Sequence, residues 1–588
     1  MPYSDLQSFL SELERRGQLR RVRIEVDALL EAGAIVDRMS KQPAAGNAPL
    51  PATDPVHGGR GGHALLFEKP KGSAVPLAMN LYGSYERMRI ALGVESFEEL
   101  ATRVKELVKP EMPTTLLEKM KKLPQLAKIA GYGPKVVKRG MCQEVARTDD
   151  ASLFDLPIIQ CWPRDGEAGY GGKPPSRSHE ATKPRSHEGS GSDEATLDAA
   201  RKGQAPQRSD EWEGTEARRH GGTEARGHGG TEARRHGGTE DSIDNRHLSI
   251  ADPGTGRYIT FAGIYTKDPE TGVRNVGMYR VQVFDRKLAA MHWHLHHDGA
   301  RHFRKYQARN ERMPLAIVLG GESVLPYAAT CPLPPDVSEL LFAGFLNDGG
   351  IELVPCKTIP MEVPVNAEIV LEGWVDPQQT LIEGPFGDHT GFYSLADRYP
   401  AFHLTAVTHR KNPIFPATIV GKPPQEDYYM GKATERIFLP LLQMLIPDII
   451  DYHLPMFGAF HNCVFVKIRK DYPLQARKVM SSIWGAGQMM FSKMIVVVDE
   501  NVNVHDEQDV LFHMGANVDW RRDTVIVDGP CDILDHSTPY CGAGGKIGID
   551  ATRKIAGEGT VRDWPDELTI GAETLALIGR RWKEYGIG

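Results

Sequence analysis

The chain has 588 residues, too many for one hydrophobic core, so two or three domains are expected. Its 70 Lys and Arg against 77 Asp and Glu leave a formal net charge of -7, which gives no electrostatic reason to bind nucleic acid or an anionic membrane. No run of about 20 apolar residues appears, so no integral membrane segment is expected. This composition favours a small molecule as the partner.

The N-terminal residues predict an amphipathic helix rather than a signal peptide. Ser4 and Gln7 have the spacing of a capping box, and Gly17 is a typical helix stop. Between them, apolar residues recur at helical spacing: Leu6, Phe9, Leu10 and Leu13. A signal peptide would instead show a continuous apolar core and a cleavage site.

The cysteines point to a reducing compartment. The chain has 7 of them, an odd number, widely spaced and without a CxxC pair. This pattern argues against disulfides and against cysteine-bound zinc or iron–sulfur chemistry. We therefore expect a cytoplasmic protein.

The patterning predicts a multi-domain α/β protein. We expect an N-terminal α/β domain over residues 1–130, a central domain over 131–420 and a C-terminal α/β domain over 421–588. The central domain is interrupted at about 167–253, where Gly, Ser, Arg, Glu and His dominate. Because large apolar residues are nearly absent there, we expect a disordered insertion that leaves the rest of the domain intact.

The insertion contains a short repeat. GTEARRHG at 214–221 returns twice with a period of eight, which places His220, His228 and His236 at equal intervals. Evenly spaced histidines raise the alternative of a metal-binding tract, but paired glycines and mixed charges favour a solvated linker.

Two segments predict specific β-structure. Residues 257–295 alternate apolar runs with turns and predict three hairpin-linked antiparallel strands, as in a barrel or a sheet folded on itself. Near the C-terminus, MIVVVD, HDEQDVLFHM and DTVIVD predict strand, helix and strand. GAGGKIG at 542–548 resembles a dinucleotide-binding loop only weakly, because its spacing is wrong and no strand is expected before it.

The densest group of candidate ligands is MHWHLHHDGARH at 291–302, which contains five histidines. On a strand, His292, His294 and His296 would share one face, where each ring nitrogen needs a partner. Singly, each histidine is more often structural. Together, with Asp298 beside them and Asn275 on the preceding strand, they favour a ligand or metal site.

A second candidate is an arginine with two acids. Arg280 lies within the apolar run VGMYRVQVF, where a buried guanidinium needs an anionic partner unless the strand is at a solvated edge. Glu383 and Asp388 flank the turn residues of EGPFGDHTG, which can aim both acids at one place. We expect their repulsion to raise at least one pKa and supply a proton donor, although a solvated turn is the simpler reading of the loop alone.

The local sequence around Glu339 has a purely structural explanation. Asp336 fits a helix N-cap and Glu339 the N3 position of its capping box. Nothing in the local sequence requires another role.

Five segments together resemble the UbiD-type carboxy-lyases in order and approximate spacing. They are NVGMYR at 275–280, MHWHLHHDG at 291–299, SELLFAG at 338–344, EGPFGDHTGFY at 383–393 and MFSKMIVVVDENVN at 490–503. The resemblance extends through NLYGSYERMRIALG and LFDLPIIQCWPRDG, and so covers nearly the whole chain except the insertion. It implies an N-terminal α/β region, a central split β-barrel that binds prenylated FMN, and a C-terminal α/β domain used for oligomerisation.

The resemblance also assigns the cofactor site. It implies that Asn275, His296 and Glu339 hold Mn²⁺ or Mg²⁺, with K⁺ as a further ion, against the flavin phosphate. The residues that fall at cofactor-contacting positions are Met278, Tyr279, Arg280, His292, Trp293, His294, His297 and Asp298. Some members have arginine and glycine in place of His297 and Asp298, so either His296 or His297 is the metal ligand.

The catalytic set implied by the resemblance is Glu383, Arg280 and Asp388, and our hypothesis is that Asp388 donates the proton that replaces CO₂. Other members have glutamate at the position of Asp388, which reaches further and suggests a different substrate. Removing CO₂ from an sp² carbon requires an electron sink that side chains lack and a modified flavin supplies. The expected reaction is therefore non-oxidative decarboxylation of an aromatic or α,β-unsaturated acid, such as a hydroxyarene acid of ubiquinone or menaquinone biosynthesis.

The resemblance further implies a flavin prenyltransferase as cofactor supplier, a homo-oligomer (dimer or hexamer), and contact with the membrane surface if the substrate is prenylated. Two other functions stay open. One is a flavin-independent, metal-dependent hydrolase or oxygenase that uses the His292 to His302 cluster. The other is a flavin-binding scaffold without catalysis.

Overall fold

The computed structural model describes residues 2–46, 49–108, 128–167, 256–294, 297–334, 337–560 and 562–587. The predicted insertion and the positions of His296 and Asp336 lie outside these residues. In the described part, no helix is long and apolar enough to cross a membrane.

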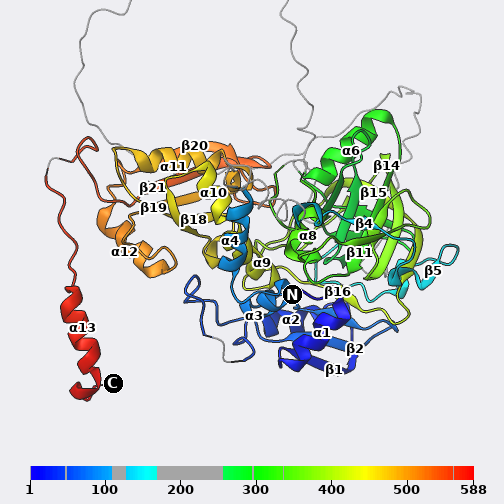
Figure 1. Cartoon of the computed structure of the whole chain (residues 1–588). Helices are drawn as coiled ribbons and strands as arrows, with labels where there is room; N and C mark the ends of the chain where they lie inside the picture. Colours follow the sequence, from blue (N-terminus) through cyan, green and yellow to red (C-terminus); the bar gives the residue numbers. More distant parts are fainter. Residues whose placement is uncertain are drawn as a thin grey trace, which may run out of the picture. The chain divides into compact units, whose positions relative to one another are not determined.

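The N-terminal region is a four-stranded sheet with helices (Figure 1). The sheet order is β1-β2-β3-β16, and β16 comes from far along the chain. The strands are β1 (Leu19–Val26), β2 (Ala64–Pro70), β3 (Leu77–Met79) and β16 (Phe415–Ala417). The helices are α1 (Leu6–Arg15), α2 (Glu31–Ser40), α3 (Tyr85–Leu92) and α4 (Phe97–Val108).

The predicted first helix is present, but its predicted cap is wrong. The N-cap of α1 is Asp5, whose carboxylate accepts a hydrogen bond from the backbone N–H of Ser8 at 2.7 Å, and Ser8 completes the capping box. The cap therefore lies one residue later than Ser4 and Gln7 predicted. The carboxylate of Asp5 is the better acceptor for an amide at the positive end of a helix. The four apolar residues named above are all buried.

The central region is built on a nine-stranded sheet, joined by the three-stranded sheet β13-β12-β4. The large sheet follows the path β6-β9-β10-β15-β14-β11-β7-β8, and β5 pairs with β15. Its strands are β5 (Val145–Arg147), β6 (Arg257–Ile259), β7 (Gly263–Lys267), β8 (Arg274–Met278), β9 (Val281–Val283), β10 (Leu288–Met291), β11 (Met313–Gly320), β14 (Ala367–Glu383) and β15 (Asp397–His409). The others are β4 (Lys135–Val136), β12 (Glu352–Pro355) and β13 (Glu362–Pro364), and the helices are α6 (Asp298–Arg309), α7 (Leu325–Ala328) and α8 (Glu339–Leu346).

The predicted three hairpin-linked strands are wrong in number. The segment forms five strands, of which β7 and β8 form one hairpin and β9 and β10 another. The expected single strand VGMYRVQVF is interrupted at Tyr279 and Arg280, and its halves, β8 and β9, belong to opposite parts of the sheet. No ladder joins the end strands β6 and β8 in the described residues, so the sheet is not a closed barrel.

The link between β8 and β9 is short. Because only two residues separate Met278 from Val281, their Cα atoms lie at most about 11 Å apart. Two strands that are distant along the hydrogen-bonded path are thus held near one another by Tyr279 and Arg280. Because β8 ends at Met278 and β9 begins at Val281, Arg280 lies outside the hydrogen-bonded ladder.

The C-terminal region is a five-stranded sheet of order β17-β18-β19-β21-β20. Its strands are β17 (Ile449–His453), β18 (Cys463–Ile468), β19 (Met494–Val498), β20 (Thr524–Pro530) and β21 (Ala543–Asp550). The helices are α9 (Glu426–Ile437), α10 (Leu439–Leu445), α11 (Gln475–Trp484), α12 (Glu507–Asn517) and α13 (Ala572–Arg581). The predicted strand, helix and strand are β19, α12 and β20, and GAGGKIG lies in and beside β21 rather than in a phosphate-binding loop.

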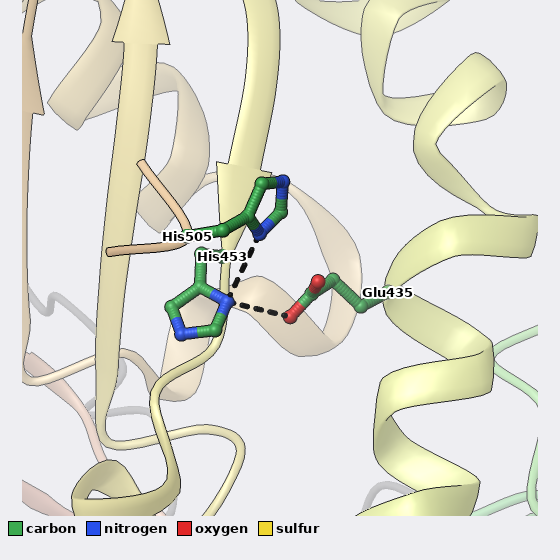
Figure 2. Close-up of side chains that lie close together, drawn as sticks. All are labelled: Glu435, His453 and His505. Carbon is green, nitrogen blue, oxygen red and sulfur yellow. Dashed lines mark hydrogen bonds and ion pairs between the residues drawn. The ribbon is translucent and has the colours of Figure 1, made fainter. Parts of the chain in front are cut away.

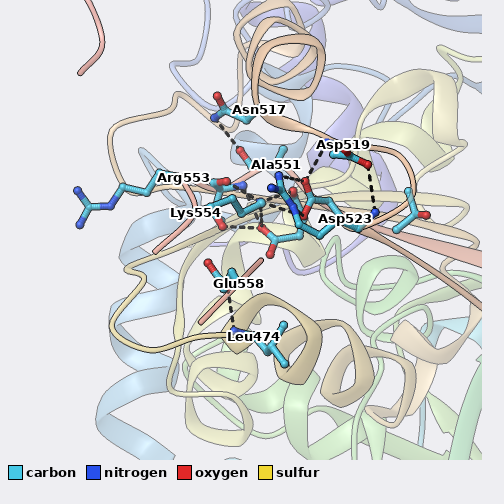
Figure 3. A network of polar contacts seen from close by, with 12 residues as sticks. Leu474, Asn517, Asp519, Asp523, Ala551, Arg553, Lys554 and Glu558 are labelled. Carbon is cyan, nitrogen blue, oxygen red and sulfur yellow. Dashed lines mark hydrogen bonds and ion pairs between the residues drawn. The ribbon is translucent and has the colours of Figure 1, made fainter. Parts of the chain in front are cut away.

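Buried ion pairs stabilise this sheet at the C-terminal ends of its parallel strands (Figure 3). Nζ of Lys470 lies 2.7 Å from Glu558, and Nζ of Lys554 lies 3.1 Å from Asp550 and 3.7 Å from Asp523. Each buried carboxylate in this network faces a lysine, so charge is compensated within the domain. By contrast, no side chain of α13 is buried among the described residues.

Candidate active site

Arg280 is the centre of a buried polar cluster. Its Nε and Nη2 atoms donate to the two carboxylate oxygens of Glu383 at 2.8 and 3.1 Å, and Nη1 donates to Oδ2 of Asp388. Nη2 also donates to Oγ of Ser394 at 3.0 Å, and the guanidinium lies 4.8 Å from the ring centroid of Phe386. The alternative of a solvated edge position is therefore wrong, since Arg280 is only 8% exposed.

Both acids reach Arg280 because of where β14 ends. Glu383 is the last residue of β14 and is fully buried, and the chain then turns through Gly384 and Pro385 toward Asp388. Gly384 has φ 99°, a conformation that side chains with a Cβ rarely adopt. The turn therefore brings two acids five positions apart onto one guanidinium, and the reading of EGPFGDHTG as a solvated turn is also wrong.

The expected rise in a carboxyl pKa does not occur at these two acids. Burial would raise the pKa of Glu383, but the charges of Arg280 and His292 outweigh it and lower the pKa to about 2. Burial likewise opposes ionisation of Asp388, but its hydrogen bond with His389 and the charge of Arg280 hold the pKa well below the usual range. A guanidinium between two carboxylates removes the repulsion that sequence reasoning assumed.

The histidine cluster contacts this centre from the end of β10. Nδ1 of His292 lies 2.8 Å from Oε2 of Glu383, and its Nε2 lies 2.9 Å from Nε2 of His294. Burial lowers the pKa of both rings, that of His294 well below its usual value. The strand ends at Met291, so the expected one-face arrangement on a continuous strand is wrong, although these two rings still meet.

The other residues expected at the cofactor lie close by. The ring of Tyr279 stacks on His297 at 5.1 Å between centroids and meets Trp293 edge-on at 6.4 Å. Gly277 is required beneath it, because a Cβ there would lie 2.2 Å from the Tyr279 ring. Met278 ends β8, and Asp298 begins α6. The structure thus gathers these residues around the link between β8 and β9.

Two of the three expected metal ligands are described, and they lie on adjoining elements. Asn275 on β8 is buried, and Oε2 of Glu339 accepts a hydrogen bond from the backbone N–H of Val276 at 2.8 Å. The capping-box explanation of Glu339 is wrong: α8 begins at Glu339 with Ser338 as its N-cap, and the Glu339 carboxylate points to β8. His296, the third expected ligand, lies outside the described residues.

Sequence reasoning missed several residues that hold in place the acid loop, which is EGPFGDHTG at 383–391. Asp165 accepts hydrogen bonds from the backbone N–H groups of Gly387 (2.8 Å), Trp162 (2.8 Å) and Cys161 (3.0 Å). Oε1 of Gln282 accepts from the backbone N–H of Gly384 at 2.8 Å. Asp165 lies in the segment LFDLPIIQCWPRDG that the resemblance includes, but nothing in its spacing predicts that it reaches a loop more than 200 residues away.

His389 was also missed. Its Nδ1 lies 3.0 Å from Oδ1 of Asp388, and its Nε2 lies 2.7 Å from Nε2 of His461, which follows α9 and β17 in the C-terminal region. The backbone N–H of His389 donates to the same Oδ1 at 2.8 Å. A pair of histidines thus extends from the acid loop to the C-terminal region.

Another buried cluster in the described part contains three side chains with metal-ligand chemistry: Glu435, His453 and His505 (Figure 2). Nδ1 of His453 lies 3.2 Å from Nδ1 of His505 and 3.8 Å from Oε2 of Glu435. However, the buried Nζ of Lys432 lies 2.5 Å from that Glu435 oxygen and 2.9 Å from Nδ1 of His453. The lysine side chain takes the position where a metal ion would bind, so the cluster is a structural charge pair.

Comparisons with known proteins agree across the chain. Family models for the 3-octaprenyl-4-hydroxybenzoate carboxy-lyase match residues 10–107 (N-terminal domain), 249–423 (Rift-related domain) and 428–551 (C-terminal domain). An uncharacterized protein of Aquifex aeolicus is 41% identical over 586 residues, covering 100% of this chain and 99% of its own. One of Archaeoglobus fulgidus is 38% identical over 586 residues, covering 99% of each.

Solved structures share the fold. The closed form of vanillic acid decarboxylase from Sedimentibacter hydroxybenzoicus has a TM-score of 0.71 at 24% identity, covering 100% of both chains. The UbiD-class enzyme HmfF from Pelotomaculum thermopropionicum, in complex with FMN, has a TM-score of 0.65 at 24% identity, covering 98% of this chain and 99% of its own. A second HmfF structure, in complex with prFMN, gives 0.65 at 22% identity, covering 98% and 100%.

The three-region α/β fold and the domain matches together define a carboxy-lyase. More specifically, the chain belongs to the UbiD family.

Proposed function

We propose that the protein removes CO₂ non-oxidatively from an aromatic or α,β-unsaturated carboxylic acid, with prenylated FMN and a divalent metal ion as cofactors. The observation that carries this proposal is the buried contact of Arg280 with both Glu383 and Asp388. Three ionisable groups in one desolvated cluster are costly for stability alone, and such clusters concentrate at active sites.

The cofactor would supply the electron sink that decarboxylation at an sp² carbon requires. Its proposed binding residues are Met278, Tyr279, Arg280, His292, Trp293, His294, His297 and Asp298, and they fit a flat aromatic group because stacked rings and a fixed cation line one region. That HmfF binds FMN and prFMN supports the same assignment. A flavin prenyltransferase is the proposed supplier.

The proposed metal ligands are Asn275, His296 and Glu339, with His297 as the alternative imidazole. They fit Mn²⁺ or Mg²⁺, which prefer oxygen ligands, and an imidazole suits Mn²⁺. Glu339 is 8% exposed, and its one hydrogen bond to another described residue comes from a backbone amide rather than from a cationic side chain. A buried carboxylate in this setting is compensated by a bound cation. K⁺ remains a proposed additional ion.

The chain's own residues then have separate tasks. Arg280, fixed at both ends of its guanidinium, orients the substrate and keeps Glu383 and Asp388 ionised in the resting protein. Asp388 is the proposed donor of the proton that replaces CO₂. Because its ordinary state beside Arg280 is the carboxylate, Asp388 has to receive one proton in each turnover before it can act as an acid.

The substrate class is a hydroxylated arene acid. Two structural relatives support it, since their names record activity on vanillic acid and on 3,4-dihydroxybenzoic acid. An acid of quinone biosynthesis, prenylated or not, is the narrower proposal. Asp388 is shorter than glutamate by one methylene, which leaves more room beside the substrate carbon than a glutamate would.

The test is CO₂ release from a panel of phenolic, naphthoic and prenylated benzoic acids by protein coexpressed with a flavin prenyltransferase. We expect a flavin absorption band and release from at least one hydroxyarene acid, and no release by protein produced without the prenyltransferase. Turnover with metal alone would favour the hydrolase or oxygenase alternative. A bound flavin without CO₂ release from any acid in the panel would favour the scaffold.

A further inference from the structure

The acid loop and the C-terminal region are joined by two imidazoles in series. Oδ1 of Asp388 faces Nδ1 of His389 at 3.0 Å, and Nε2 of His389 faces Nε2 of His461 at 2.7 Å. Each contact joins a ring nitrogen to a group that can exchange a proton with it. Oδ2, the other oxygen of Asp388, accepts a hydrogen bond from Arg280. Burial alone would lower the pKa of Arg280, but the charges of Glu383 and Asp388 raise it above its usual value.

Arg280 therefore cannot supply the proton that Asp388 needs. His389 also contacts Asp388, and its imidazole can both donate and accept a proton. The remaining nitrogen of the series, Nδ1 of His461, is buried and has no hydrogen-bond partner among the described residues. A buried ring nitrogen without a partner is costly and marks a place where a water molecule or another proton carrier fits.

We propose that His389 and His461 form a proton relay that returns Asp388 to its acid form in each turnover. This inference rests on the proposed decarboxylation. It assigns His461 as the point of proton uptake in the C-terminal region and His389 as the group that passes the proton to the acid loop.

The proton balance closes without a further reactant. One proton binds Nδ1 of His461, the proton on its Nε2 moves to Nε2 of His389, and the proton on Nδ1 of His389 moves to Oδ1 of Asp388. Asp388 then donates its proton to the carbon from which CO₂ has left, and the electron pair of the broken C–C bond forms the new C–H bond. Each ring then returns to its starting tautomer by losing the proton on one nitrogen to water and gaining one from water on the other, so each turnover consumes one proton and releases one CO₂.

The environments of the two rings favour a proton on His389, next to Asp388, over a proton on His461. Burial lowers the pKa of His461 to about 4, whereas Asp388 raises that of His389 against the effect of burial. The other charged groups that face the pair are Asp427 on α9, and Asp532 and Asp535 beyond β20. The ring of Phe460 stacks on His389 at 5.2 Å between centroids, which fixes the plane of its imidazole.

The decisive variant is His461→Gln in the reconstituted enzyme. Glutamine can keep a hydrogen bond to Nε2 of His389 but cannot pass a proton, so kcat should fall about ten- to a hundredfold with KM and the flavin band unchanged. Exogenous imidazole should restore part of the rate. The matched control is His536→Gln, because His536 is an exposed histidine of the same region that contacts Phe392 and not the relay.

A wild-type kcat and pH profile in His461→Gln, measured from pH 6 to 9 with a wild-type enzyme that releases CO₂, would overturn the relay. A wild-type enzyme that releases none would instead overturn the proposed function. The coupling is also measurable without substrate: His461→Gln should shift the pH at which the His389 contribution to unfolding free energy disappears. If wild type and His461→Gln show the same pH dependence of stability, the two rings do not share a proton and the relay is wrong.

Discussion

Arg280 and Glu383 are 103 residues apart in the chain and form a two-point ion pair, with Nε to Oε1 at 2.8 Å and Nη2 to Oε2 at 3.1 Å. This geometry fixes the plane of the guanidinium and leaves Nη1 directed at Asp388. The ion pair therefore determines where Asp388 lies, and most of the expected effects of mutations in this cluster follow from it.

Asp388→Asn should abolish turnover and leave cofactor binding intact. Asparagine keeps the size of the side chain and a hydrogen bond to Arg280, but it cannot act as an acid. The measurements are CO₂ release and the flavin absorption of the purified variant. Asp528→Asn, on the exposed β20, is the control and should behave as wild type. If Asp388→Asn turned over at the wild-type rate, Asp388 would not be the donor.

Glu383→Gln should destabilise the protein by about 1–3 kcal/mol, because it removes a buried carboxylate that binds both Arg280 and His292. Chemical denaturation at pH 7 measures the change. In the control Glu362→Gln, the lost pairs with Lys267 and Arg274 are partly solvated, so we expect a loss of at most about 1 kcal/mol. Equal losses in the two variants would mean that burial of Glu383 adds nothing to its pairing.

The stabilisation that His389 contributes to the folded protein should decrease as the pH rises. Its folded pKa is raised by Asp388, so its stabilising contribution is complete below the unfolded value of about 6.5 and is lost as pH rises through the raised folded value. The difference in unfolding free energy between wild type and His389→Asn should therefore shrink from pH 6 to pH 9. Histidines that do not contact His389 titrate alike in both proteins and cancel in this difference. A difference that grows with pH would contradict the assigned direction.

Lys432→Met should lower the unfolding free energy by about 3–5 kcal/mol, because it leaves the buried Glu435 without one of its two cationic partners. Lys478→Met removes a pair with Asp448 in which the lysine is half exposed, so it should cost at most about 1 kcal/mol. If the two variants lost equal stability, the buried lysine would not serve as the cation of that cluster.

Replacing residues 173–241 by a short Gly/Ser linker should leave thermal stability and cofactor binding unchanged. The only large apolar residues of the replaced segment are Leu197 and Trp212, too few to build a core, and loop length costs little free energy. Differential scanning calorimetry and the flavin band check this. A large drop in Tm would show that the segment contributes packing that its composition does not predict.

The sequence predicts the class of fold and the identity of the polar cluster better than its geometry. The first helix, the C-terminal strand, helix and strand, and the three acting groups Arg280, Glu383 and Asp388 follow from periodicity, turn residues and the resemblance. Their contact could not be predicted from their spacing in the sequence, because it depends on β14 ending next to the two-residue link between β8 and β9.

Other features depend on long-range contacts that local patterns cannot contain. The capping-box reading of Glu339 failed because its carboxylate pairs with the backbone of β8, a segment 63 residues earlier. The lowered pKa values of the two acids depend on a cation placed between them. His389 carried no signal of its own, since a histidine beside an aspartate in a loop is common, and only its contact with His461 distinguishes it.

The two-residue connection between β8 and β9 has a consequence for protein engineering. Tyr279 and Arg280 span the whole distance between strands from opposite parts of one sheet, so a single inserted residue there would rotate the guanidinium away from both acids. Variation that retunes the enzyme is therefore best introduced through the size of side chains around the Arg280 cluster, with the chain length at this crossing held constant.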